Sequence, residues 1–125
     1  MRLLLDTHIF LWAVAGSSQL RAPARRLIEA ADEVYVSAAS IWEIAIKARL
    51  GKLKADPAEL VAAIEASGFR ELPVKAAHAA GVAELELHHN DPFDRLLVAQ
   101  ALAEPLRLMT TDELLSSYGS LILMV

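Results

Sequence analysis

The chain contains no cysteine, so it can form neither a disulfide bond nor a thiolate metal site. No apolar run in its 125 residues approaches the roughly 18 residues that a membrane-spanning helix needs. The first apolar run meets a carboxylate at Asp6, too early for the apolar segment of a secretory signal peptide. These absences predict a cytoplasmic protein that has no membrane segment.

Basic residues are few. The chain has 12 Lys and Arg against 16 Asp and Glu, with a formal net charge of −4. Proteins that bind nucleic acids contact phosphates mainly through Lys and Arg, so this balance weighs against a broadly basic binding surface. A pocket in which acidic side chains hold a metal ion would remove the objection, because the ion reverses the local sign of the charge.

The apolar content is high. Hydrophobic residues make up 55% and charged residues 22% of the sequence, which excludes an intrinsically disordered chain. The length predicts one domain that spans residues 1–125. The excess of apolar residues has two interpretations that the composition leaves open: an α/β protein rich in Ala and Leu, or a surface that a partner covers.

Short apolar runs alternate with segments of helical periodicity, which is typical of α/β proteins. The expected strands are residues 2–5, 34–36, 69–74, 106–109 and 121–125. The expected helices are residues 7–15, 23–31, 38–50, a helix opened by Asp56 and Pro57, 75–85, 92–103 and 111–116. Strands separated by helices need crossover connections, so we expect a central, mostly parallel sheet with helices on both faces.

Two aspartates follow predicted strands. Asp6 comes directly after the run 2–5, and Asp112 comes just after the run 106–109. Either side chain could simply cap the helix that follows, a common role of Asp. A charge at the end of a buried strand is otherwise costly, unless it is paired or binds a metal.

Two further acids lie on predicted helices. Asp94 follows Asp91, and one of these two suffices as the cap of the helix that Pro92 opens, although Asp94 could merely complement the helix dipole. Glu43 lies on the apolar helix 38–50 and is either exposed or directed into a polar pocket. The inner face of that helix is assigned to Ile41, Trp42, Ala45 and Ile46.

The four acids are expected to converge, because ligands of parallel sheets bind beyond the carboxyl ends of the strands. Carboxylates packed together repel one another and raise one another's pKa. A hard cation removes the repulsion, and oxygen ligands suit Mg²⁺ or Mn²⁺. Such a site favours in-line hydrolysis of phosphodiesters.

Four segments resemble the PIN domain family in order and spacing. They are residues 4–8 (LLDTH), 37–44 (SAASIWEI), 91–101 (DPFDRLLVAQA) and 109–112 (MTTD). The third is quite specific to the family, whereas the Asp-Thr pair at the start would be weak by itself. The resemblance covers essentially the whole chain. Within the family, they resemble the VapC-type ribonuclease toxins.

The resemblance implies a PIN-like fold and a Mg²⁺- or Mn²⁺-dependent endoribonuclease. Thr7 and Thr111 would support the acids, and we interpret the additional acid Asp91 as a helix cap. Asp6 and Asp94 would bind the metal, Glu43 would hold it or orient its water, and Asp112 would complete the cluster. Carried over by position, the catalytic residues and metal ligands would be Asp6, Glu43, Asp94 and Asp112.

The resemblance also implies partners. They are an RNA substrate, a VapB-type antitoxin that lays a tail over the pocket, and a second copy of the chain in a homodimer or in a toxin–antitoxin hetero-oligomer. Two alternatives within the family stay open: a nuclease of RNA processing outside a toxin pair, and a catalytically silent, partner-binding PIN fold. A receiver-type signalling module also fits the length, but it needs paired acids after the first strand, where Thr7 follows Asp6.

Three other groups of side chains have less specific interpretations. A basic run near Gly51 is either a solvated helix end or a surface that steers RNA; its members are Lys47, Arg49, Lys52 and Lys54. Arg95 is expected to pair within the protein. The larger aromatic side chains are expected mostly in the core, with an antitoxin groove as the alternative: Phe10, Trp12, Trp42 and Phe93. The histidines lack the spacing of a zinc site and are expected in exposed loops: His8, His88 and His89.

Overall fold

Five parallel strands form one sheet in the order β3-β2-β1-β4-β5 in the computed structural model, which describes all 125 residues. Each neighbouring pair is parallel. The α/β prediction with a mostly parallel sheet is therefore confirmed. The strands are β1 (Arg2–Leu5), β2 (Glu33–Ser37), β3 (Arg70–Leu72), β4 (Arg107–Thr110) and β5 (Ile122–Met124).

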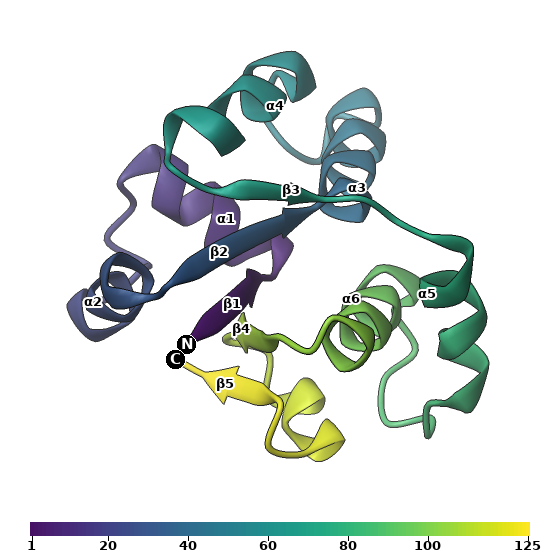
Figure 1. The fold of residues 1–125 in the computed structure, drawn as a ribbon. Coiled ribbons are helices and arrows are strands. Elements are labelled where there is room, and N and C mark those ends of the chain that lie inside the picture. The colour runs from purple at the N-terminus through teal and green to yellow at the C-terminus, as the bar shows by residue number, and fades with distance from the viewer.

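Helices cover both faces of the sheet. Helices α1 to α4 lie against one face, and α6 lies against the other with α5 packed beside it (Figure 1). None of the helices combines the length and the apolar character needed to cross a membrane. They are α1 (Thr7–Ala15), α2 (Ala22–Ala30), α3 (Ala38–Arg49), α4 (Pro57–Ala66), α5 (Ala76–Gly81) and α6 (Pro92–Ala103), with two 3₁₀ helices, η1 (Val82–Glu84) and η2 (Glu113–Tyr118).

Successive side chains of β1 point to opposite faces of the sheet, where the core forms two layers. Leu3 and Leu5 point toward the layer formed with α1 to α4, and Leu4 points toward the layer formed with α6 and η2. All three side chains are completely buried. Burial of one leucine contributes about 1.5–3 kcal/mol to folding, so this central strand anchors both layers.

Three predicted elements differ from the structure at their ends. The expected strand 69–74 is shorter, because Pro73 has no N–H to donate to the ladder. The expected helix 75–85 ends as an α-helix at Gly81 and continues as η1. The expected helix 111–116 is the 3₁₀ helix Glu113–Tyr118.

The predicted inner face of α3 is wrong for Trp42, whereas Ile41 packs against the core as expected. Trp42 is 60% exposed, whereas Ser40 and Glu43 are buried. The hydroxyl of Thr7 on α1 contacts both of these polar side chains: it donates to Glu43 Oε1 at 2.7 Å, and its oxygen lies 3.0 Å from the hydroxyl of Ser40. A polar contact therefore decides which face of α3 turns inward, and the apolar periodicity of the sequence does not report it. Gly51 ends the helix as predicted, with a φ of 72° that favours glycine.

Candidate metal centre

The acidic residues gather at the carboxyl edge of the sheet. Asp6 follows β1, Asp112 follows β4, Glu43 lies on α3 after β2, and Asp94 lies in the first turn of α6. Because all strands are parallel, their carboxyl ends meet at this one edge. Asp6 and Asp112 each cap the helix that follows them, and both still lie at this shared edge.

Asp6 is buried and bound from two sides. Its Oδ1 accepts the backbone N–H of Ile9 at 2.9 Å and so caps α1, and its Oδ2 accepts the hydroxyl of Thr110. Burial raises the pKa of Asp6 above its usual value, although the hydrogen bonds from Thr110 and Ile9 oppose the shift. The cap interpretation is therefore correct, and the second oxygen faces the end of β4.

Glu43 is buried, as the polar-pocket interpretation predicted. Its Oε1 accepts the Thr7 hydroxyl at 2.7 Å, and its Oε2 accepts the ammonium of Lys47 at 2.7 Å. The hydrogen bond to Glu43 raises the pKa of Lys47. Lys47 thus belongs to the acidic cluster, while Arg49, Lys52 and Lys54 are exposed. The spacing of four residues between Glu43 and Lys47 could have indicated this pair from the sequence.

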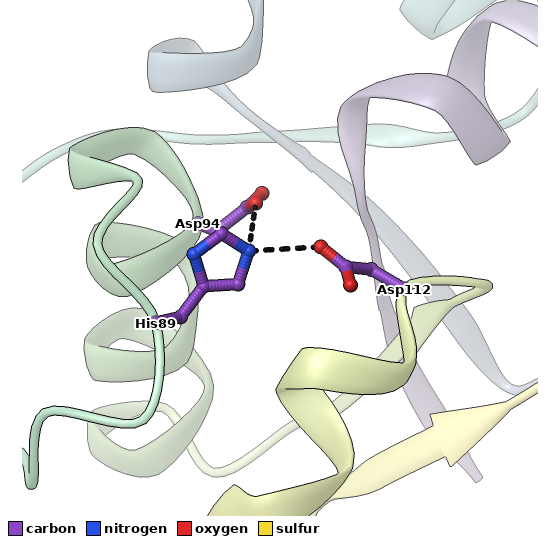
Figure 2. Close-up of side chains that lie close together, drawn as sticks. All are labelled: His89, Asp94 and Asp112. Carbon is purple, nitrogen blue, oxygen red and sulfur yellow. Dashed lines mark hydrogen bonds and ion pairs between the residues drawn. The ribbon is translucent and has the colours of Figure 1, made fainter.

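Asp94 and Asp112 approach each other on either side of His89 (Figure 2). The Nε2 of His89 lies 2.8 Å from Oδ2 of Asp112 and 3.3 Å from Oδ2 of Asp94. One ligand atom from each of these residues lies within 4.8 Å of the others, a spacing that suits one metal ion. The expectation of histidines in exposed loops is wrong for His89, whose side chain is only 12% exposed, and holds for His88. His8 is exposed, but it lies on α1 and not in a loop.

Asp94 carries the clearest electrostatic sign of the site. Burial raises the pKa of Asp94 to about 7, and the neighbouring charges of Asp91, Asp6 and Glu43 add to the increase, while His89 opposes it. Repulsion therefore links Asp94 to Asp6 and to Glu43. A buried group of carboxylates with this much repulsion is chemically suited to a hard divalent cation.

Thr110 is a supporting residue that the sequence interpretation missed. Its hydroxyl donates to Asp6 and accepts the backbone N–H of Asp112 at 3.0 Å, so it joins the ends of β1 and η2. Thr111, which was expected in this role, is exposed and lines a separate hollow of about 750 Å³ with Trp12 and Val125. Thr110 is the last residue of β4 and Thr111 follows it, so the alternation of side chains along the strand decides which of the two turns inward.

Asp91 and Arg95 organise the loop and helix beside the site. Asp91 caps α6 by accepting the backbone N–H groups of Phe93 and Asp94, as predicted. Arg95 pairs within the protein, also as predicted, but its partners are the carbonyls of Val82 and Glu86, each at 3.2 Å. The guanidinium therefore holds the loop between η1 and α6.

Two of the larger aromatic side chains pack against each other outside the two core clusters. Trp42 and Phe93 meet edge to face with their centroids 5.2 Å apart, and they line a hollow of about 290 Å³ between α3 and α6. Phe10 is completely buried, as expected, and Trp12 packs at the margin of the core. The core prediction is therefore wrong for Trp42.

The sequence matches the PIN domain family over residues 3–121. Ribonuclease VapC22 of Mycobacterium tuberculosis is 34% identical over 117 residues, which make up 92% of this chain and 90% of that protein. Among solved structures, VapBC2 of Rickettsia felis bound to a promoter DNA fragment gives a TM-score of 0.69 at 16% identity and covers 100% of this chain and 98% of that chain. VapC20 of Mycobacterium tuberculosis, a Sarcin-Ricin loop cleaving toxin, gives a TM-score of 0.64 at 18% identity. The match covers 94% of this chain and 95% of that chain.

The two solved structures share the fold with this chain, and the family match extends over nearly its whole length. The resemblance seen in the four sequence segments is thereby confirmed. The chain belongs to the PIN domain family, with a VapC ribonuclease among its relatives.

Proposed function

We propose that this PIN domain is a divalent-metal-dependent endoribonuclease that acts in the cytoplasm as the toxin of a type II toxin–antitoxin pair. One observation carries the metal dependence: Asp94, Asp112 and His89, from separate elements, place ligand atoms within 4.8 Å of one another. Repulsion from the buried acids Asp6 and Glu43 also contributes to the raised pKa of Asp94. The relative that is named a ribonuclease supports RNA as the substrate.

The proposed metal ligands and catalytic residues are Asp6, Glu43, Asp94 and Asp112. A divalent ion, Mg²⁺ or Mn²⁺, would neutralise charge on the scissile phosphodiester and make water more acidic when bound. The chain itself supplies the geometry. Thr110 orients Asp6, Thr7 and Lys47 hold the two oxygens of Glu43, and the cap at Asp91 places Asp94 in the first turn of α6.

The proposed partner is a VapB-type antitoxin, because structural neighbours of the chain are toxin–antitoxin complexes. Trp42 and Phe93, which precede Glu43 and Asp94 in the sequence, line an apolar hollow, and we propose that the antitoxin tail is seated there. We also propose a homodimer, since several large apolar side chains are exposed. They include Trp42, Leu50, Leu87, Leu102 and Leu114.

The test of the nuclease proposal is cleavage of a defined RNA pool by the purified chain, with Mn²⁺, with Mg²⁺ or with a chelator. We expect cleavage only with a divalent ion, and we expect Asp6→Asn to lower it by at least about 100-fold, because it removes a proposed ligand charge. Mapping of transcripts cut after induced expression would then identify the target sequence.

Asp56→Asn is the matched control. Asp56 caps α4 at an exposed position, and Asn preserves a cap while removing the same single charge. Metal-independent cleavage, or equal cleavage by wild type and Asp6→Asn, would contradict the proposal. Metal binding without any RNA cleavage would instead favour the silent, partner-binding alternative. Toxicity that a co-expressed upstream reading frame abolishes would separate a toxin from a nuclease of RNA processing.

A further inference from the structure

His89 is the side chain that joins two of the proposed metal ligands. Asp112 comes from the segment between β4 and η2, and Asp94 comes from α6. The Nε2 of His89 reaches both carboxylates, at 2.8 Å and 3.3 Å, from the loop that precedes α6 (Figure 2). His89 thus bridges two carboxylates that would otherwise repel each other, one at the start of η2 and one on α6.

The chain determines which nitrogen of His89 carries the proton. The backbone N–H of Asp91 donates to Nδ1 of His89 at 3.0 Å, so Nδ1 is an acceptor and has no proton. In a neutral imidazole the proton then resides on Nε2, which is the nitrogen that faces the carboxylates. An Nε2 that bears a proton has no free lone pair for a metal, so His89 is placed to donate to the ligands and not to act as one.

The ring is held in this position by its surroundings. The loop carbonyl of Glu86 accepts both the guanidinium of Arg95 at 3.2 Å and the hydroxyl of Tyr118 at 2.9 Å. Arg95 also donates to the carbonyl of Val82 in η1, which precedes the loop. The loop is therefore anchored to α6 and to η2, the elements that flank the two carboxylates.

Asp112 depends on this contact more than the other acids do. Its side chain is 37% exposed, and its Oδ1 is used to cap η2 through the N–H of Leu114. Its Oδ2 accepts a hydrogen bond from no residue except His89. Without that donor, repulsion from Asp94 would favour rotation of the Asp112 carboxylate toward solvent.

We propose that His89 is a positioning residue that donates its Nε2–H to Asp112 and Asp94 and holds them at the separation that a divalent ion requires. The proposal rests on the proposed function, because it assumes that these carboxylates bind a metal. Partners that orient metal ligands typically change metal affinity by 10–100-fold when they are removed.

The test is Mn²⁺ binding by calorimetry in the absence of RNA, with the full chain and its variants. We expect His89→Ala to bind Mn²⁺ about 10–100-fold more weakly, and His89→Gln, which keeps an N–H donor within reach, to remain within about threefold of wild type. His88→Ala is the matched control, since its exposed ring packs against Tyr118 and touches neither carboxylate. Circular dichroism establishes that each variant is folded.

A second measurement separates positioning from direct ligation. Electron spin-echo spectra of Mn²⁺ bound to the wild-type protein should show no coupling to a ¹⁴N nucleus of His89. The spectrum of His89→Ala should therefore have lost no ¹⁴N coupling that wild type shows. Such a coupling would overturn the proposal by making His89 a ligand. Equal or tighter Mn²⁺ binding by His89→Ala, or a His89→Gln variant as weak as His89→Ala, would also overturn it. If wild type binds no Mn²⁺, the proposed function fails together with this inference.

Discussion

At the scale of single residues, two of the proposed metal ligands, Asp94 and Asp6, oppose the stability of the metal-free fold. Asp94 has a pKa of about 7 in the folded chain, against an ordinary value of 3.8, chiefly because it is buried. Between these two values the folded protein binds more protons than the unfolded chain. The free energy of unfolding therefore falls as pH rises through this window, and the raised pKa of Asp6 acts in the same direction.

We therefore expect the metal-free protein to unfold at a lower temperature at pH 7.5 than at pH 5. Addition of Mn²⁺ at pH 7.5 should raise the unfolding temperature, because an ion that binds only the folded state stabilises it. Differential scanning calorimetry with a chelator, and then with Mn²⁺, measures both effects. A metal-free protein that is more stable at pH 7.5 would contradict the assignment of a raised pKa to Asp94.

Asp94→Asn provides the control for that experiment. The substitution removes the charge that burial disfavours, so it should reduce the pH dependence and stabilise the metal-free protein at pH 7.5. The same substitution should abolish metal-dependent RNA cleavage. Gain of stability with loss of activity is the behaviour expected where a functional site is kept at the expense of the fold. A variant less stable than wild type at pH 7.5 would argue that Asp94 is a structural carboxylate.

At the scale of elements, α6 separates the roles of two nearby acids. Asp91 accepts the N–H groups of Phe93 and Asp94, whereas the carboxylate of Asp94 faces His89 and the other acids. Asp91→Ala should lower the free energy of unfolding by about 0.5–2 kcal/mol through loss of the cap, and Asp91→Asn by much less. Urea unfolding measures the difference. Asp91→Asn should keep most of the RNA cleavage, and its complete loss would make Asp91 the ligand.

The end of β4 offers a second test at this scale. Thr110→Val removes the hydroxyl that binds both Asp6 and the N–H of Asp112 and leaves these groups without that partner. We expect the free energy of unfolding to fall by about 1–3 kcal/mol, the usual cost of an unsatisfied buried polar group. Thr110→Ser keeps the hydroxyl and should lose less. Equal losses in denaturant unfolding would assign the effect to the methyl group instead.

At the scale of the whole molecule, one sheet joins two core layers. Leu4 packs against α6 and η2, and its neighbour Leu5 packs against α1 to α4. Leu4→Ala and Leu5→Ala should each lower the free energy of unfolding by about 2–5 kcal/mol. Because β1 belongs to both layers, each variant should still unfold in one transition, with circular dichroism and tryptophan fluorescence coinciding. Separate transitions would show that the layers unfold independently.

Much of the architecture could be predicted from the sequence. Short apolar runs and helical segments alternate, and crossovers between them require parallel strands, so the sheet and its two helical faces followed from local patterns. Proline and aspartate at the starts of α4 and α6 predicted those helix caps. Local patterns also identified the acids of the candidate site. Each of them lies just after a predicted strand, at the start of a predicted helix, or within an otherwise apolar helix.

The sequence by itself determined the order of elements, the caps and the position of the acids at one edge of the sheet, because these depend on local propensity and on parallel topology. Only the tertiary structure decided which face of α3 turns inward, that Thr110 rather than Thr111 supports Asp6, and that His89 lies between Asp94 and Asp112. These are hydrogen bonds between residues distant in sequence, and the one from His89 is made from a loop. No periodic pattern encodes such contacts, because they form only when the packed layers bring the elements together.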